Sequence, residues 1–107
     1  MNKQRAGLLE EARKRGTPFW ERVAADLDRA SRKRRIVNLT RLARITKEND
    51  IVIVPGKVLG DGELPHKITL AAYTFSDTAK EKLKHCKTMT IQEFMKEHPK
   101  GAGRIIG

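Results

Sequence analysis

The chain has 107 residues and a formal net charge of +10, with 38% hydrophobic and 5% aromatic residues. This length fits a single domain with a small, mostly aliphatic core. No segment resembles a signal peptide, and the longest apolar run, Ile51–Val54, is far shorter than the ~20 residues of a membrane-spanning helix. A single cysteine, Cys86, excludes an intramolecular disulfide and is typical of a soluble protein in a reducing compartment. We expect no membrane partner, and we expect a polyanion to neutralise the charge.

Two helices are predicted in the first third of the chain. Residues 3–15 carry a thin apolar stripe that ends at Gly16. Thr17 is the predicted N-cap of a second helix, residues 18–30, with Pro18 at its first position. We interpret Trp20 as a core anchor rather than a stacking partner for a nucleic-acid base. The apolar residues that recur at helical spacing in this second helix are Phe19, Trp20, Val23, Ala24 and Leu27.

Positive charge is concentrated before residue 48. Residues 1–47 contain 14 Lys or Arg against 5 Asp or Glu, a net +9, whereas residues 48–107 contain 9 against 8. Ten of the 14 are Arg, whose planar guanidinium can bond a phosphate through two N–H groups. We predict a basic helical RNA-binding segment, residues 1–35, and a compact α/β body, residues 36–107, within one structural domain overall. A merely solvated helical face is the alternative.

The run Arg32–Arg35 places four cations side by side. Because these charges repel one another, the stability of the fold does not explain their presence. A localisation signal or a solvated linker are the alternatives to phosphate contact. A short helix predicted from Leu39 places Arg41 and Arg44 three residues apart, so that both extend the same cationic face. The predicted RNA-binding residues of the first part are Lys3, Arg5, Arg13, Lys14, Arg15, Arg29, Arg32, Lys33, Arg34, Arg35, Arg41 and Arg44.

Beyond residue 48 the pattern changes to buried strands. Residues 50–54 predict a strand that is buried on both faces, and Pro55-Gly56 predicts a turn after it. Another turn is predicted at Gly60–Gly62. Residues 67–75 predict a second buried strand, whose alternation assigns side chains to two faces. The expected faces are Ile68, Leu70 and Ala72 on one side, and Ala71, Tyr73 and Phe75 on the other.

Two capped helices and a short strand complete the predicted body. Ser76 is the expected cap of a helix that buries Ala79, Leu83 and Cys86. A short strand follows near Thr88-Met89, and Thr90–Glu93 fits a capping box. The last helix buries Ile91, Phe94 and Met95 and ends before Pro99. The second part is therefore predicted to run strand, strand, helix, strand, helix, and the fold class is α/β.

No catalytic or metal site is apparent. Gly56-Lys57 lacks the Ser or Thr that follows the lysine of a phosphate-binding loop. His66, His85 and His98 are too widely spaced for a local metal motif. Cys86, at an apolar helical position, is interpreted as a small core residue. We expect no enzyme activity, no cofactor, no metal and no small-molecule substrate.

The middle of the chain resembles a known family. The segments that carry the resemblance are Val37–Leu39, Ile51–Gly60 with Gly62, Thr69–Ala72, Phe75-Ser76, His98–Gly101, Arg104–Ile106 and the pair Phe19-Trp20 after a proline. They are similar to the archaeal and eukaryotic large-subunit ribosomal protein eighteen-e family, which is related to bacterial ribosomal protein fifteen. The chain departs from the family at the tail, where Gly103 runs directly into Arg104. The short length suggests the archaeal form.

The resemblance implies an irregular β-β-α superhelical body and a basic N-terminal segment wound into ribosomal RNA. Lys57 matches the family's Pro-Gly-Lys and becomes a further predicted RNA-binding residue. The expected function is a structural constituent of the large ribosomal subunit that binds and stabilises folded ribosomal RNA in the cytoplasm. The expected partners are large-subunit ribosomal RNA and neighbouring ribosomal proteins. A DNA-binding chromatin-type protein and an extraribosomal RNA-binding adaptor are the alternatives.

Overall fold

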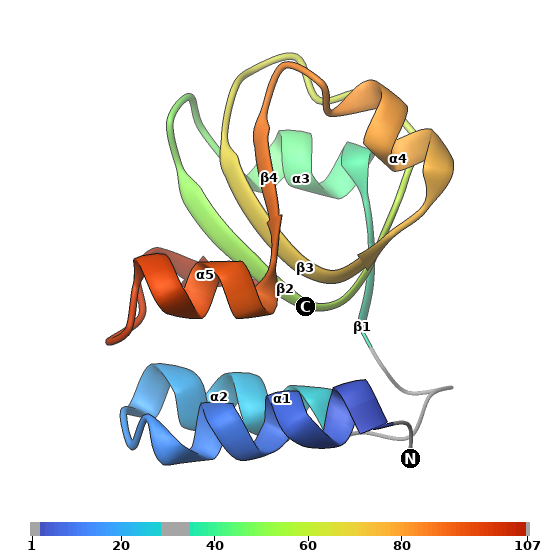
Figure 1. Ribbon diagram of the computed structural model, residues 1–107. Coiled ribbons are helices and arrows are strands. Elements are labelled where there is room, and N and C mark those ends of the chain that lie inside the picture. Colours follow the sequence, from blue (N-terminus) through green and yellow to red (C-terminus); the bar gives the residue numbers. More distant parts are fainter. Residues whose placement is uncertain (1–2, 29–34, 107) are drawn as a thin grey trace.

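The computed structural model describes residues 3–28 and 35–106 and forms an α/β structure (Figure 1). The predicted α/β class is confirmed. The predicted order strand, strand, helix, strand, helix after residue 48 is also present, but it is followed by a short strand at Arg104–Ile105 that was not predicted. None of the described helices has the length and apolarity needed to span a bilayer. The elements are α1 Lys3–Lys14, α2 Pro18–Leu27, β1 Arg35–Asn38, α3 Leu39–Ile45, β2 Ile51–Leu59, β3 Thr69–Phe75, α4 Asp77–Lys82, β4 Lys87–Thr90, α5 Ile91–Glu97 and β5 Arg104–Ile105.

All described strands pair in parallel in one sheet. The order is β1-β2-β3-β4, and β5 pairs with the first half of β2. β1 pairs with the second half, from Arg35 opposite Gly56 to Asn38 opposite Leu59. Parallel strands are usually buried on both faces, and β2 follows this rule because residues 52–56 are all buried. The prediction of a doubly buried strand at residues 50–54 is therefore confirmed for Val52–Val54, whereas Ile51 is partly buried and Asp50 precedes the strand.

The predicted turn at Pro55-Gly56 is wrong, since β2 continues through both residues to Leu59. Its register with β3 shifts here, because Val54 pairs with Ala72 but Lys57 pairs with Thr74. Two residues of β2 therefore lie opposite one residue of β3. Proline has no N–H to donate to the ladder, and an irregularity of this kind accommodates it inside a sheet.

The same irregularity corrects the predicted faces of β3. Leu70 and Ala72 lie on one face, and Ala71 and Tyr73 lie on the other, as strict alternation predicts. Phe75 was assigned to the face of Ala71, but it packs with the residues on the face of Leu70. Alternation holds only while the strand keeps its pleat, and the register shift interrupts it.

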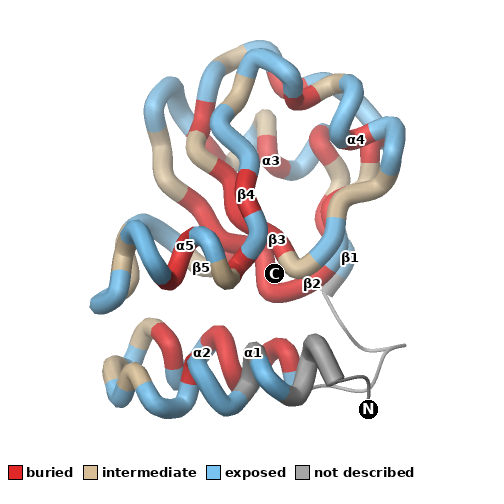
Figure 2. The backbone as a smooth tube through the Cα atoms, viewed as in Figure 1, coloured by how far each residue is buried: buried red, intermediate tan, exposed pale blue. Residues whose placement is uncertain are grey.

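The sheet separates two hydrophobic cores, seen as the red segments in Figure 2. α1, α2 and α5 cover one face, and α3 and α4 contribute to the core on the other. The first core consists of Ala12, Trp20, Val23, Ala24, Leu27, Ile53, Ala71, Met89, Ile91, Phe94 and Met95. The second core consists of Val37, Leu39, Leu42, Val52, Val54, Val58, Leu64, Ile68, Leu70, Ala72, Ala79, Leu83 and Ile106.

α1 and α2 form a helical hairpin whose second helix is anchored by Trp20. The Thr17 side chain accepts a hydrogen bond from the Trp20 backbone N–H, which confirms the predicted N-cap. Trp20 is fully buried, and its indole N–H donates to the Pro99 carbonyl at 3.0 Å. Its ring also meets those of Phe19 and Phe94 edge-on, at centroid distances of 5.0 and 6.0 Å. The core-anchor interpretation is confirmed.

The predicted caps of the last two full helices are also present. Ser76 Oγ accepts from the Ala79 N–H at 3.1 Å at the start of α4. At α5, Thr90 Oγ1 accepts from the Glu93 N–H at 3.1 Å, and the Glu93 carboxylate accepts from the Thr90 N–H at 3.0 Å. This reciprocal capping box leaves both donors satisfied. Cys86 is partly buried against the second core, in agreement with its prediction as a small core residue, but its predicted helical position is wrong because α4 ends at Lys82.

Candidate nucleic-acid interface

The predicted RNA-binding residues fall into three places, and only some of their side chains are described. Arg13, Lys14 and Arg15 lie on the helical hairpin, Arg41 and Arg44 on α3, and Lys57 on β2. The other predicted residues lie outside the described side chains, so their roles stay predictions. They are Lys3, Arg5, Arg29, Arg32, Lys33, Arg34 and Arg35.

The cations of the hairpin are balanced by carboxylates of the same hairpin. Each of the three described predicted residues forms an ion pair, and each pair has an N–O distance of 3.3 Å. Such exposed pairs contribute roughly 0–1 kcal/mol each, so a phosphate can replace the carboxylate at little cost. They nevertheless reduce the net field of the hairpin. The pairs are Arg13–Asp28, Lys14–Glu10 and Arg15–Glu11.

α3 presents its two arginines without acidic partners. Leu39 and Leu42 are buried in the second core, and this orientation turns Arg41 and Arg44 towards solvent. Within residues 3–28 and 35–106, neither arginine side chain forms a hydrogen bond or an ion pair. Both guanidinium groups are therefore available to phosphates, and their three-residue spacing keeps them close together on the helix.

The loop before β3 fixes the start of α3. The Thr40 backbone N–H donates to the Asp61 carbonyl at 3.1 Å. Gly62 lies directly beyond, at φ +88°, and a Cβ there would approach Thr40 Oγ1 to 1.9 Å. Only glycine fits this left-handed conformation and this close approach. The predicted glycine-rich segment Gly60–Gly62 thus allows the loop to contact the first turn of the helix that carries Arg41 and Arg44.

Lys57 lies on the opposite face of the sheet from α3. It is an exposed residue inside β2 rather than in a turn after it, and it pairs in register with Ile36 on one side and Thr74 on the other. Its neighbour Val58 faces the second core, so Lys57 faces the other way. All three residues of this row are exposed, including Ile36, which is 60% exposed. The described predicted cations therefore do not form one continuous patch.

Sequence reasoning missed several exposed cations because they are isolated along the chain and form no run. Within the described residues, these additional side chains have no ion pair: Lys47, Lys67, Lys80 and Lys100. Arg104, which had no assigned contact, is structural. Its guanidinium donates to the Ile45 carbonyl and pairs with Asp50 at 3.5 Å, so it connects β5 to the end of α3.

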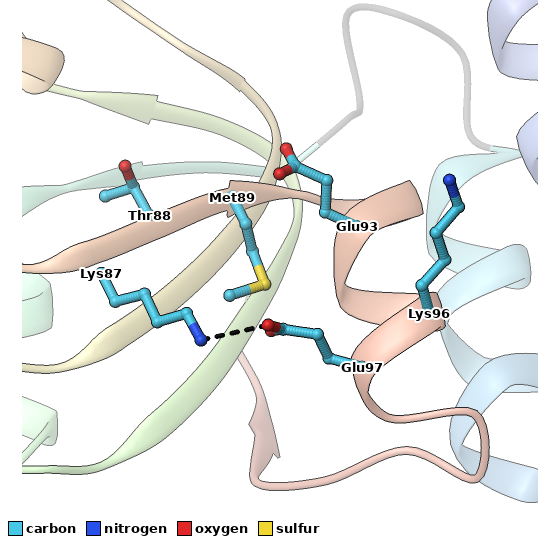
Figure 3. Close-up of a pocket in the computed structure, with 6 residues that line it drawn as sticks. All are labelled: Lys87, Thr88, Met89, Glu93, Lys96 and Glu97. Carbon is cyan, nitrogen blue, oxygen red and sulfur yellow. Dashed lines mark hydrogen bonds and ion pairs between the residues drawn. The ribbon is translucent and has the colours of Figure 1, made fainter.

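A hollow of about 270 Å³ lies between β4 and α5 (Figure 3). One of its two lysines is paired with a carboxylate, since Lys87 Nζ lies 3.1 Å from Glu97 Oε1. The lining contains two lysines and two glutamates, and Met89 lies between the strand and the helix. Glu93 is engaged in the capping box. The Thr90 backbone N–H is the main cause that lowers the pKa of this carboxyl below 4.5, followed by the Thr90 hydroxyl and Lys96. This balanced lining does not suit an anion.

Metal binding has no support in the described part of the chain, where no cluster of three His, Cys, Asp or Glu residues could hold an ion. The arrangement that the structure does present is a set of exposed guanidinium and ammonium groups on both faces of a parallel sheet. Such groups can bind phosphates through charge-assisted hydrogen bonds.

Comparison with known proteins places these features in a family. The family described as "Ribosomal proteins 50S-L15, 50S-L18e, 60S-L27A" matches residues 20–86, a stretch that contains Arg41, Arg44 and Lys57. Three archaeal relatives carry the name large ribosomal subunit protein eL18. The protein of Methanococcus maripaludis is 41% identical over 89% of this chain and 81% of its own length. That of Archaeoglobus fulgidus is 39% identical over 90% and 84%. That of Sulfolobus acidocaldarius is 40% identical over 92% and 86%.

The match covers β1, β2 and β3 and includes Trp20, so it contains most of the sheet together with the cations of α3 and β2. The chain belongs to the family of ribosomal proteins 50S-L15, 50S-L18e and 60S-L27A.

Proposed function

We propose that this protein is a non-catalytic structural constituent of the large ribosomal subunit, located in the cytoplasm, that binds and stabilises folded large-subunit ribosomal RNA. The observation that carries the proposal is the 41% identity, over 89% of the chain, to a protein named as a large ribosomal subunit protein. The exposed, unpaired guanidinium groups of Arg41 and Arg44 support it.

The chemistry of the interface is neutralisation of phosphates. Each cation that contacts a phosphate releases a condensed counterion, and this release favours binding. The deep, narrow major groove of A-form RNA excludes side chains, so recognition depends on shape and backbone. Cations on both faces of the sheet, at α3 and at Lys57, suit a protein that lies between RNA segments.

The finer architecture belongs to the same proposal. Residues 1–35 act as a basic helical RNA-binding segment, and residues 36–107 act as the body, with the irregular β-β-α superhelical form that the family resemblance implies. Neighbouring large-subunit ribosomal proteins are the expected protein partners. The excess of 14 Lys or Arg over 5 Asp or Glu in residues 1–47 supports an RNA-facing first part.

The test is a sucrose-gradient separation of native cell extract, with each fraction probed for this chain at low and moderate salt. The proposal predicts co-migration with the large subunit that survives moderate salt. Residence with nucleoid DNA would indicate the chromatin-type alternative instead, and residence in the light fractions would indicate an extraribosomal adaptor. Either result would overturn the ribosomal assignment.

A further inference from the structure

A second hollow lies at the end of the sheet where the parallel strands begin. Its volume is about 260 Å³, and it is lined by Asn49, Lys67, Ile68, Thr69, His85 and Lys87. These residues precede or start β2, β3 and β4. In Figure 1 this end of the sheet is at the top of the view, and α1 and α2 are at the bottom. We name it the amino-end pocket.

Backbone hydrogen bonds hold the rim of the amino-end pocket. The Asn49 N–H donates to the Lys67 carbonyl at 2.7 Å, and the Thr69 N–H donates to the Asp50 carbonyl at 2.9 Å. The Lys87 N–H donates to the Ile68 carbonyl at 3.1 Å. These hydrogen bonds connect the starts of β2, β3 and β4, so the rim of the pocket is held by the sheet.

Three side chains on this rim are donors without a partner in the described part of the chain, whereas His85 Nε2 lies 2.7 Å from the Leu64 carbonyl oxygen and Lys87 pairs with Glu97. Within the described residues, the Lys67 ammonium, the Asn49 amide and the Thr69 hydroxyl make no hydrogen bond or ion pair. Asn49 also holds a left-handed φ of +69°, which asparagine tolerates better than most residues and which is often found at functional sites. The unused donors and the strained backbone meet at one place.

The amino-end pocket differs in the charge of its lining from the hollow beside α5. No carboxylate lines the amino-end pocket, whereas Glu93 and Glu97 line the other. The nearest acids by sequence, Glu48 and Asp50, flank Asn49 and are both engaged. Glu48 accepts the Lys67 backbone N–H at 2.9 Å, and Asp50 accepts the Lys47 backbone N–H at 2.8 Å and pairs with Arg104 at 3.5 Å. Lys87 pairs with Glu97 at the surface, and an exposed pair of this kind is weak enough to exchange for another anion.

We propose that the amino-end pocket binds a phosphate group of the RNA backbone. Cationic and neutral donors around a small hollow match a tetrahedral oxyanion. The volume is below the roughly 300–1,000 Å³ of pockets that enclose whole small molecules, so a single group suits it better than a cofactor. The inference rests on the proposed function and adds an RNA contact at the start of the strands, remote from the helical hairpin that covers one face of the sheet.

The experiment measures binding of deproteinised large-subunit ribosomal RNA over a series of salt concentrations. Lys67→Ala is expected to weaken binding several-fold and to lower the salt slope by about 1, as expected for one lost phosphate contact. Asn49→Gly removes a neutral donor but keeps the left-handed backbone, so it is expected to weaken binding at an unchanged slope. Lys84→Ala, which removes a lysine that is paired with Glu81 at 3.0 Å and lies outside every proposed contact, is the matched control with unchanged affinity and slope.

The outcomes separate this inference from the proposed function. Wild-type affinity and slope in both pocket variants would overturn the amino-end pocket and leave the ribosomal assignment intact. Failure of the wild-type protein itself to prefer this RNA over duplex DNA would contradict the proposed function. A titration with inorganic phosphate, followed by amide NMR, distinguishes the source of the anion. Shifts at Asn49 and Thr69 without any effect of the variants on RNA binding would indicate a free-anion site and overturn the RNA contact.

Discussion

The helical hairpin of α1 and α2 and the body around α3 both carry predicted RNA-binding cations, but the two regions differ in how these charges are used. On the hairpin, Arg13 and Lys14 each lie 3.3 Å from a carboxylate oxygen. On α3, Arg41 and Arg44 have no such partner within the described residues. A carboxylate so close cancels much of the attraction of a cation for a distant phosphate. The formal charge of a segment therefore overstates the charge that it offers to a polyanion.

The regions also differ in what holds them in place. α2 is attached through large apolar side chains, above all the fully buried Trp20, which shares the first core with Ile53 and Phe94. α3 is a seven-residue helix that depends on Leu39, Leu42 and its bond to the loop at Asp61. The helical hairpin, which belongs to the part of the chain with the higher net charge, is thus also packed deeply into the first core.

The largest expected effect comes from Trp20→Ala. Truncating a large buried aromatic side chain destabilises a protein by roughly 3–5 kcal/mol, and this variant also loses the bond to the Pro99 carbonyl. Denaturant unfolding followed by circular dichroism should show one cooperative transition at a much lower midpoint. Ala25→Gln, at an exposed position of the same helix, should change the free energy of unfolding by less than about 0.5 kcal/mol. Two separate transitions, with the sheet unaffected, would show that the hairpin is an independent unit.

The second prediction sets the unpaired cations against the paired ones. The double variant Arg41→Ala, Arg44→Ala should lower the salt slope of ribosomal RNA binding by about 1.5, close to two phosphate contacts. The matched double variant Arg13→Ala, Lys14→Ala should lower it less, because Asp28 and Glu10 already oppose those charges. Filter-binding titrations from low to moderate salt provide the measurement. Equal effects, or a larger effect on the hairpin, would contradict the distinction between the two regions.

The smallest expected effect concerns the start of α5, whose Phe94 stacks on Phe19 of the hairpin at 6.2 Å. Thr90→Ala should destabilise the protein by about 1 kcal/mol, because a backbone N–H of the first turn loses its acceptor. Chemical denaturation at neutral pH measures this loss. Thr90→Ser, which keeps the hydroxyl, is the control and should retain most of the stability.

The Glu93 side of the same capping box predicts a pH dependence. Its folded pKa is lowered, first by the Thr90 backbone N–H, so its stabilisation is fully present above the ordinary value of 4.5. The stabilisation is lost as the pH falls from there through the lowered pKa. The stability difference between wild type and Glu93→Gln should therefore be constant near neutrality and shrink on acidification. A difference that grows at low pH would contradict the sign of the pKa shift.

Local patterns predicted much of the fold because the interactions that they describe are local. Thr17, Ser76 and Thr90 each satisfy a backbone N–H within three residues, so the caps could be read directly from the chain. Prediction failed where pairing with a strand far away in the sequence determines the local structure. At Pro55-Gly56 the local turn signal was wrong because β2 continues through both residues, paired with β3 on either side of the register shift and with β1 from Gly56 onward. The same register shift places Phe75 on the other face.

The candidate site was less predictable than the fold. The arginines of α3 were correctly predicted to extend outward, because helical periodicity alone separates them from Leu39 and Leu42. That Arg13 meets Asp28, fifteen residues away, follows only from the packing of α1 on α2. Likewise Asn49, Lys67 and Lys87 lie far apart along the chain and meet only because three parallel strands begin at one end of the sheet.

The sequence by itself therefore determined the α/β class, the caps, the buried stripes, the family and the concentration of cations before residue 48, because these depend on composition and on neighbours a few residues apart. The tertiary structure alone decided which cations are paired, on which face of the sheet each one lies, and which donors line a common pocket. Strand order and register bring distant residues together, and coulombic interactions depend on separation in space rather than along the chain.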